Sequence, residues 1–165
     1  MTLTIEDATK EDLTCILNIM NEEILKTTNI YDTTTRNDNY IQTWFSSKQS
    51  EGYPVLVARV GHQVIGYATY GPFRPFEGYR FTVEHSIYLA KEHQHKGLGR
   101  NLMTALIDLA KVQGFHVMVG GIDAANVPSI TFHKKAGFTE VGRLPQVGRK
   151  FDQWLDLVLM QLLLK

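Results

Sequence analysis

Gln94-His95-Lys96-Gly97-Leu98-Gly99-Arg100 lies between an apolar segment, residues 86–90, and an amphipathic segment, residues 101–113. The first segment is typical of a β-strand, and the spacing of apolar residues in the second predicts an α-helix. Glycines let the backbone approach a ligand closely, and the first amides of a helix have no partner inside that helix. Because these amides and the helix dipole attract anions, the stretch predicts a phosphate-binding turn between a strand and a helix.

Two common nucleotide-binding motifs do not match this glycine turn. A dinucleotide-binding fingerprint needs a third glycine at position 102, where the chain has Leu102. A Walker loop ends in Gly-Lys-Ser or Gly-Lys-Thr; Gly61 and Gly66 have the required spacing, but Tyr67-Ala68 follows them. The turn therefore holds another kind of phosphate ligand or is an ordinary strand–helix connection.

Hydrophobic periodicity along the chain predicts one strand, two helices, three strands, a helix, a strand, a helix and two strands. The predicted strands cover residues 3–5, 55–60, 64–70, 81–90, 117–119, 138–141 and 151–163. The predicted helices begin after Thr9 and after Thr35, cover 101–113, and run from Pro128 to Gly137, with a loop or broken helix at 26–39. With no linker or repeat, we expect residues 1–165 to form one mixed α/β domain, whose parallel part lies around the glycine turn.

Composition excludes several classes of protein. The chain has 17 basic and 17 acidic residues, which argues against a non-specific nucleic-acid or membrane-surface binder. Cys15 is the only cysteine, so no internal disulfide can form. The N-terminus lacks a charged leader with an apolar stretch, and the apolar run 154–164 is too short to span a bilayer. We therefore expect a cytoplasmic protein with no nucleic-acid or membrane partner.

A second motif, Asn126-Val127-Pro128-Ser129-Ile130-Thr131-Phe132-His133-Lys134-Lys135-Ala136-Gly137-Phe138, follows the next predicted strand. Together with the glycine turn it resembles the GNAT superfamily of acyl-CoA-dependent N-acetyltransferases. That family has an Arg/Gln-x-x-Gly-x-Gly/Ala turn on the CoA pyrophosphate, and a helix of this second pattern near the thioester. The resemblance implies acetyl-CoA as co-substrate and a GNAT fold: a mixed, mostly antiparallel sheet with a central parallel strand pair, flanked by helices.

Further segments, 82–88, 147–150, 154–156 and 160–161, resemble the phosphinothricin acetyltransferase branch, which includes enzymes that acetylate methionine sulfoximine and methionine sulfone. The resemblance implies a homodimer and an acceptor that is a small amino acid with a tetrahedral, polar side-chain end. One departure is Asp152-Gln153, where the branch usually has a glycine in the final turn. The geometry of that turn is therefore left open.

The resemblance also assigns residues to cofactor binding. Backbone groups of Ile87, Tyr88 and Leu89 would pair with the pantetheine arm as if it were another strand. Asn126 would bond the same arm, and Lys135 would reach toward the nucleotide. The pyrophosphate would be held by the amides of His95, Lys96, Gly97, Leu98, Gly99 and Arg100. For the side chains of Lys96, Arg100 and Lys135, solvated surface charge is the alternative interpretation.

Two residues are candidates for catalysis. Glu84 lies in an apolar strand, where a carboxylate is costly unless it is paired or used, and burial would raise its pKa and improve it as a general base. The alternative is a structural pair with Arg80. His133 stands where many members of the family have a tyrosine that acts as general acid, and a histidine can also donate a proton. The alternative is a core or surface histidine.

The acceptor side needs a group that binds a carboxylate, and the planar guanidinium of Arg74 matches one in two-pronged fashion. Pro75 and Phe76 would form a wall of the pocket. The resemblance places the substrate contacts at Arg74, Pro75, Phe76, Glu84, His85 and Ser86. His85 follows Glu84 in a strand, so we expect its side chain to point to the opposite face, away from the cleft.

We expect the first two helices and their loop, with Tyr31 and Trp44, to cover the cleft, and for these two side chains we favour the alternative of packing in the core. His93 and His95 lack a third ligand nearby, so we expect no metal. The sequence thus predicts an acetyl-CoA-dependent N-acetyltransferase that acts by direct transfer, since Cys15 lies far from the motifs. The alternatives are another amine acceptor (a polyamine, an aminoglycoside or a protein N-terminus) or a non-catalytic acyl-CoA sensor, which would not need Glu84 and His133.

Overall fold

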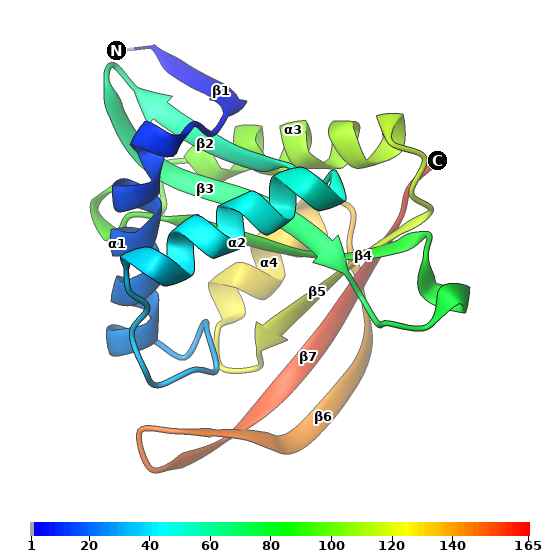
Figure 1. Cartoon of the computed structure of the whole chain (residues 1–165). Coiled ribbons are helices and arrows are strands. Elements are labelled where there is room, and N and C mark those ends of the chain that lie inside the picture. The colour runs from blue at the N-terminus through cyan, green and yellow to red at the C-terminus, as the bar shows by residue number, and fades with distance from the viewer. Residues whose placement is uncertain (1) are drawn as a thin grey trace.

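The computed structural model describes residues 2–165, which form one seven-stranded sheet with four α-helices (Figure 1). The strand order is β1-β2-β3-β4-β5-β7-β6. The strands are β1 (Leu3–Asp7), β2 (Val55–Val60), β3 (Gln63–Pro72), β4 (Thr82–Leu89), β5 (Val117–Asp123), β6 (Thr139–Lys150) and β7 (Gln153–Leu163). The helices are α1 (Leu13–Lys26), α2 (Asp38–Glu51), α3 (Leu98–Val112) and α4 (Val127–Lys135). Neighbouring strands are antiparallel except β4 and β5, so the predicted sheet and element order are confirmed.

Most element boundaries differ from the prediction by a few residues, β5 extends to Asp123 rather than residue 119, and the differences at α3 and β6 have clear physical reasons. Helix α3 begins at Leu98 rather than residue 101, because Gly97 takes a left-handed conformation (φ 75°) that lets the chain turn directly into the helix. Strand β6 extends to residue 150 rather than 141. Its side chains are largely exposed on both faces, so its sequence carries no alternation from which a strand could be recognised.

Helices cover both faces of the sheet. On one face, α1 and α2 bury Ile16 and Phe45 against Val57 of β2. On the other face lie α3 and α4 (Figure 1). They pack over a larger cluster in which Leu102 and Leu106 are completely buried. Burying each of these leucines contributes about 1.5–3 kcal/mol, which fixes α3 and its N-terminal turn to the sheet. None of the helices formed by residues 2–165 is long and apolar enough to cross a membrane.

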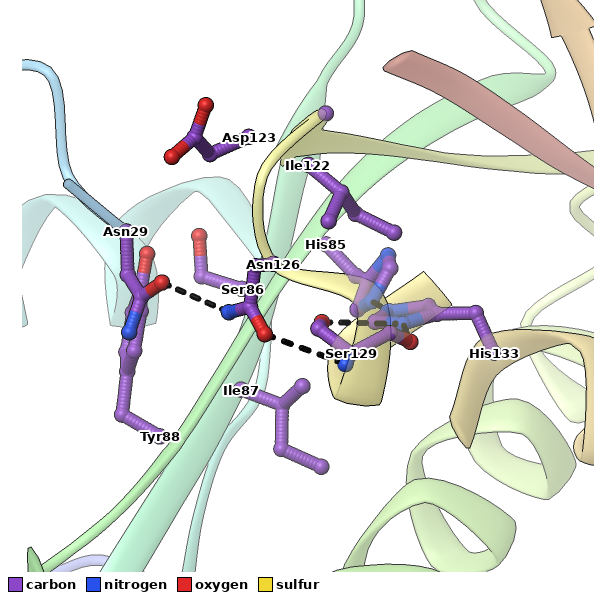
Figure 2. A pocket seen from close by; sticks show the side chains of 11 residues that line it. Asn29, His85, Ser86, Ile87, Tyr88, Ile122, Asp123, Asn126, Ser129 and His133 are labelled. Atoms are coloured by element: carbon purple, nitrogen blue, oxygen red, sulfur yellow. Dashed lines mark hydrogen bonds between the residues drawn. The ribbon is translucent and has the colours of Figure 1, made fainter. Parts of the chain in front are cut away.

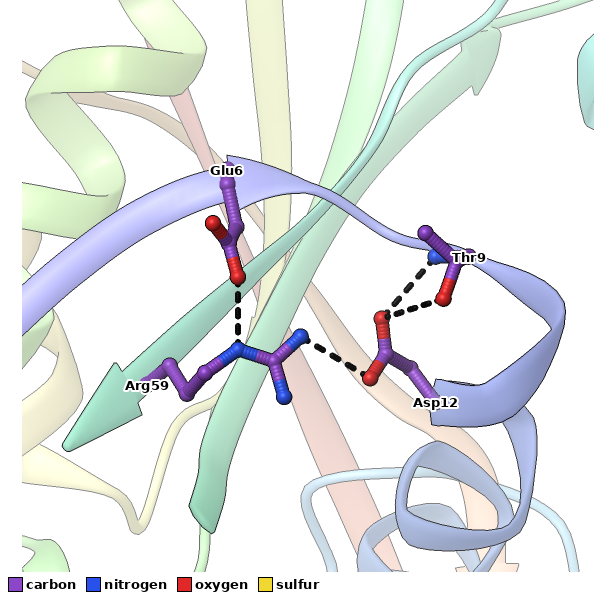
Figure 3. A network of polar contacts seen from close by, with 4 residues as sticks. All are labelled: Glu6, Thr9, Asp12 and Arg59. Atoms are coloured by element: carbon purple, nitrogen blue, oxygen red, sulfur yellow. Dashed lines mark hydrogen bonds and ion pairs between the residues drawn. The ribbon is translucent and has the colours of Figure 1, made fainter. Parts of the chain in front are cut away.

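A charged network joins the first elements (Figure 3). Arg59 of β2 donates to Glu6 of β1 at 2.6 Å and to Asp12, which precedes α1, at 2.9 Å. Asp12 also accepts from the backbone N–H of Thr9 at 2.9 Å. Although Asp12 is desolvated by burial, the Thr9 and Arg59 contacts prevail and hold its pKa below its usual value. The network therefore fastens α1 to the sheet edge.

Strands β4 and β5 separate after a short parallel contact. They pair only where Thr82, Val83 and Glu84 lie beside residues 117–119, while β4 continues to pair with β3 as far as Leu89. Among residues 2–165, the backbone of 85–89 thus has no ladder partner on the β5 side. The amide of Gln94 donates to the carbonyl of Leu89 at 3.0 Å and closes the end of this gap. The result is a wedge with free peptide groups beside the glycine turn.

The β6–β7 hairpin turns at Phe151 and Asp152, and its far end reaches beyond the helices (Figure 1). Both residues have left-handed conformations (φ 52° and 58°), and Lys150 pairs with Gln153 across the turn. This is the arrangement of a two-residue type I′ turn, which favours asparagine and glycine. The missing glycine noted in the sequence therefore leaves two side chains in a strained conformation.

Candidate functional site

A pocket of ≈ 90 Å³ opens in the wedge between β4 and β5 (Figure 2). Its walls come from both strands, from the start of α4 and from the segment between α1 and α2. The lining residues are Asn29, His85, Ser86, Ile87, Tyr88, Gly121, Ile122, Asp123, Asn126, Ser129 and His133. The pocket therefore brings together the strand and the second motif that the sequence singled out.

Two histidines meet at the floor of this pocket. Nε2 of His85 lies 2.9 Å from Nε2 of His133, and the side chains are only 6% and 3% exposed. Nδ1 of His85 lies 3.0 Å from the Val119 carbonyl, and Nδ1 of His133 lies 2.7 Å from the Ser129 carbonyl. Burial, together with the charge that His133 can carry, lowers the pKa of His85 to about 3, and burial also lowers the pKa of His133.

The position of His85 corrects one prediction. Its side chain does lie on the face opposite Glu84, as strand alternation requires, yet it lines the pocket instead of pointing away from the site. The separation of β4 from β5 lets α4 reach that face and place His133 there. Gly120 makes the contact possible, because a Cβ on this residue would lie 2.6 Å from Cε1 of His85. A glycine pair inside an apolar strand was the sequence signal for this close approach.

Glu84 is exposed as a whole residue and is not part of the pocket lining. Its carboxylate lies beside Gly121, with Oε2 3.9 Å from where a Cβ on that glycine would be. Desolvation of its carboxyl group raises the pKa of Glu84, and the positive charge of Arg74 partly opposes this increase. The proposed structural pair with Arg80 does not form, because Arg80 pairs with Glu77 at 3.7 Å.

Arg74 is exposed in the loop after β3, with its guanidinium 5.2 Å from the centre of the Phe73 ring. No carboxylate in residues 2–165 lies within ion-pair distance of it, so it can receive a ligand carboxylate. Pro75 and Phe76 are exposed, Phe76 by 71%, and neither lines the pocket as a wall. Ser86 does line it.

The residues expected to hold the cofactor lie along the wedge. Ile87 and Tyr88 line the pocket, while the carbonyl of Leu89 is occupied by Gln94. The glycine turn follows at the surface, where Gly99 is buried against Phe132 and the other turn residues are exposed or partly exposed. These are His95, Lys96, Gly97, Leu98 and Arg100, and Lys135 is also exposed, at the end of α4.

Asn126 was expected to bond the cofactor arm, but both ends of its amide have partners within the chain (Figure 2). Its Nδ2 donates to Asn29 Oδ1 at 2.7 Å, and its Oδ1 accepts from the Ser129 N–H at 3.1 Å and caps α4. Asn29 in turn donates to Glu23, a buried residue of α1, at 2.7 Å. Sequence reasoning missed Asn29 and Glu23, since the contact joins residues 97 positions apart.

The segment around Asn29 is held over the pocket from several sides. Thr28 donates to the buried Asp123 at the end of β5, and Tyr31 donates to the Asp156 carbonyl at 3.0 Å. Lys150, only 2% exposed, donates to the Ile30 carbonyl at 2.7 Å. Tyr31 therefore lies in the cover, partly buried and outside both core clusters, and not in the core.

Trp44 packs edge-on against Tyr67, with ring centres 6.1 Å apart. Within residues 2–165, no group of three or more His, Cys, Asp or Glu is arranged to hold a metal ion.

Comparisons with known proteins agree with this geometry. The model of the acetyltransferase (GNAT) domain family matches residues 5–159. The chain is 47% identical over 163 residues to the L-methionine sulfoximine/L-methionine sulfone acetyltransferase of Pseudomonas aeruginosa, covering 98% of this chain and 95% of the relative. It is 34% identical to the phosphinothricin N-acetyltransferase of Streptomyces viridochromogenes, covering 93% and 83% of the two chains.

A solved structure, described as yncA, a putative acetyltransferase from Salmonella typhimurium with its cofactor acetyl-CoA, superposes with a TM-score of 0.96. It is 46% identical in sequence, and the match covers 100% of this chain and 95% of that one. The fold that carries the wedge, the glycine turn and the helix after β5 is therefore shared with a structure that contains acetyl-CoA. The chain belongs to the GNAT acetyltransferase family.

Proposed function

We propose that this protein transfers the acetyl group of acetyl-CoA directly to the α-amine of a small amino acid of the methionine sulfone, methionine sulfoximine or phosphinothricin type. The observation that carries the proposal is the wedge between β4 and β5. The backbone of 85–88, which has no ladder partner on the β5 side, can pair with an extended arm, and the glycine turn at its end offers amides to a pyrophosphate. An acyl-CoA spanning both would bring its thioester to the pocket that His133 and Ser129 line.

The acceptor would approach from the face that carries Glu84 and Arg74. Arg74 has no ion-pair partner in residues 2–165 and would bind the acceptor carboxylate in two-pronged fashion. Glu84, whose pKa is raised by desolvation, would take the proton of the attacking amine. The two charges act on one another, so an acceptor held by Arg74 would lie near the base.

Direct transfer is favoured over an acetyl-enzyme. Cys15, the only cysteine, is exposed on α1 and does not line the pocket. Attack by a bound amine on a bound thioester needs only that the two are held in contact.

We also propose a cytoplasmic homodimer. Large apolar side chains of the β6–β7 hairpin are exposed: Val141, Leu144, Val147 and Trp154, the last by 60%. Several exposed apolar side chains on one hairpin are typical of a protein–protein interface, and a second copy would bury them. Sedimentation at micromolar concentration would show a mass twice that of the 18.8 kDa chain. A monomer at that concentration would refute the proposal.

The function is tested by following acetyl-CoA consumption with a panel of amines. Methionine sulfone, methionine sulfoximine and phosphinothricin should be acetylated, and spermidine, an aminoglycoside and an alanine-ended peptide serve as the competing classes. If the protein acetylates one of these competing amines faster than the amino acids, the proposed amino-acid acceptor is rejected in favour of that amine. CoA binding without turnover on any amine would identify an acyl-CoA sensor instead.

A further inference from the structure

The contacts of His85 and His133 require more protons than two neutral rings possess. A carbonyl oxygen only accepts, so Nδ1 of His85 must carry a hydrogen toward Val119, and Nδ1 of His133 must carry one toward Ser129. The two Nε2 atoms, 2.9 Å apart, need one further hydrogen between them. Three contacts therefore need three protons, whereas two neutral imidazoles hold two.

We propose that the His85–His133 pair takes up this third proton and delivers it, through the Ser129 hydroxyl, to the sulfur that leaves when acetyl-CoA reacts. The inference rests on the proposed acetyl transfer. In this scheme His133 is the acid that supplies the proton to Ser129. His85 is a positioning residue, whose Nε2 holds Nε2 of His133 and shares a proton with it.

The surroundings disfavour the third proton while the pocket is empty, so one of the three contacts then lacks its hydrogen. Burial lowers the pKa of both rings, and the flanking groups are apolar: Phe138 lies 5.3 Å from each ring centre, and β5 contributes Gly120. Among charged groups, only His133 affects the pKa of His85.

Three charged side chains are close to the two histidines in the sequence or line the same pocket. Each of them lies on another face, is exposed to solvent or pairs with another group. Glu84 is on the opposite face, Lys134 is exposed, and Asp123 accepts from Thr28. None of these three groups favours a third proton on the pair. Uptake of that proton is favoured by the negative charge that develops on a thioester in the pocket as it reacts.

The route to the sulfur runs along α4. Ser129 Oγ lies 3.4 Å from Nδ1 of His133, and both residues line the pocket. As the carbon–sulfur bond breaks and its electron pair moves to sulfur, the sulfur takes the hydroxyl proton of Ser129, and Oγ takes the proton from Nδ1 of His133. The pair is left with two protons, and the bare Nδ1 can accept from the renewed hydroxyl. The third proton is then replaced from solvent.

The first test needs no variant and no turnover. Histidine ¹⁵N signals of the intact protein are followed against pH, alone and with CoA bound; the other four histidines (His62, His93, His95 and His116) give separate signals in the same spectra. We expect His85 and His133 to change together, with uptake of one proton by the pair, both alone and with CoA, whose thiol is uncharged at the low pH of this step. Two independent steps in either state would overturn the shared proton.

The second test compares His85→Gln with His85→Phe. A glutamine amide can still bond Nε2 of His133 but cannot share a titrating proton, whereas phenylalanine fills the space without a hydrogen bond. Both variants should lower kcat by about 10–100-fold, the usual effect of losing an orienting partner, and leave the KM for acetyl-CoA within about twofold. His116→Phe, at an exposed site, is the matched control and should retain full activity.

Full activity in His85→Gln would show that His85 only orients its neighbour and would overturn the proton-sharing role. Thermal unfolding of each variant checks folding, and if His85→Phe does not fold, the wild-type titration still decides. The two proposals fail separately: absence of turnover on any amine rejects the acetyl transfer, while uncoupled histidine signals reject the pair even in an active enzyme.

Discussion

Asn126 donates a hydrogen bond of 2.7 Å from Nδ2 to Oδ1 of Asn29, 97 positions away in the chain. The bond connects the cap of α4 to the segment that follows α1, and Glu23 extends it into the α1 helix. One side of the pocket is therefore closed by a series of hydrogen-bonded polar side chains and not by apolar packing. A cofactor arm that used the Asn126 amide would have to share it with this chain.

Replacing Asn29 should loosen this cover. In Asn29→Ala both Asn126 and Glu23 lose a hydrogen-bonding partner, which should lower the free energy of unfolding by about 1–3 kcal/mol. Chemical denaturation measures the loss, and limited proteolysis should cut within residues 27–32 sooner. Asn101→Ala, at an exposed position of α3, is the control. Equal stability of the two variants would mean that the Asn29–Asn126 bond does not hold the cover.

Glu84→Gln should lower kcat by about 10²–10⁴-fold, the usual contribution of a general base, without weakening CoA binding. Because desolvation raises the pKa of Glu84, and only the ionised form accepts a proton, wild-type turnover should fall as pH drops through that raised value. The variant should lack this acidic limb. A pH profile with the same limb in both proteins would exclude Glu84 as the base.

Arg74→Ala should raise the KM for the amino-acid acceptor by about ten- to hundredfold, as expected for the loss of 1.5–3 kcal/mol from a charged hydrogen bond. The KM for acetyl-CoA should stay unchanged. Arg80→Ala removes an exposed arginine of the same region that pairs with Glu77 and serves as the control. If both variants bind the acceptor equally well, Arg74 does not hold its carboxylate.

Asp12→Asn should lower stability at neutral pH by about 1–3 kcal/mol, since Thr9 and Arg59 lose a charged acceptor. The folded-state pKa of Asp12 is lowered, so its contribution is present above the unfolded value of about 4 and is lost as pH falls through the folded value. The variant should therefore show a flatter decline of stability below about pH 4. Unfolding curves between neutral and acid pH, with exposed Asp108→Asn as control, measure the difference.

The strained turn at the end of the β6–β7 hairpin can be relaxed. Phe151→Asn with Asp152→Gly places the preferred residues in both left-handed positions and should stabilise the fold by about 1–2 kcal/mol. Phe151→Ala removes the exposed ring but keeps the Cβ, so it should give no such gain. A melting temperature that rises equally in both proteins would assign the effect to the ring and not to the backbone.

Much of the fold was predictable because its signals are local. Apolar alternation and helical spacing identified the order of elements, and positions such as Gly97 mark where a strand can turn into a helix. Strand β6 was predicted too short because it is exposed on both faces, which removes the alternation that identifies a strand. The pKa of Glu84 is raised, as expected for a carboxylate in an apolar strand, but the residue is exposed because β4 separates from β5 just after it.

The sequence by itself determined the family, the element order and the glycine turn, since each depends on residues that are neighbours in the chain. Only the tertiary structure decided which side chains share the pocket. His85 and His133 are 48 positions apart, and they meet because β4 and β5 separate and Gly120 leaves room for an imidazole. Neither separation of strands nor the approach of α4 to the opened face is encoded in any single segment; both follow from how the sheet and helices pack together.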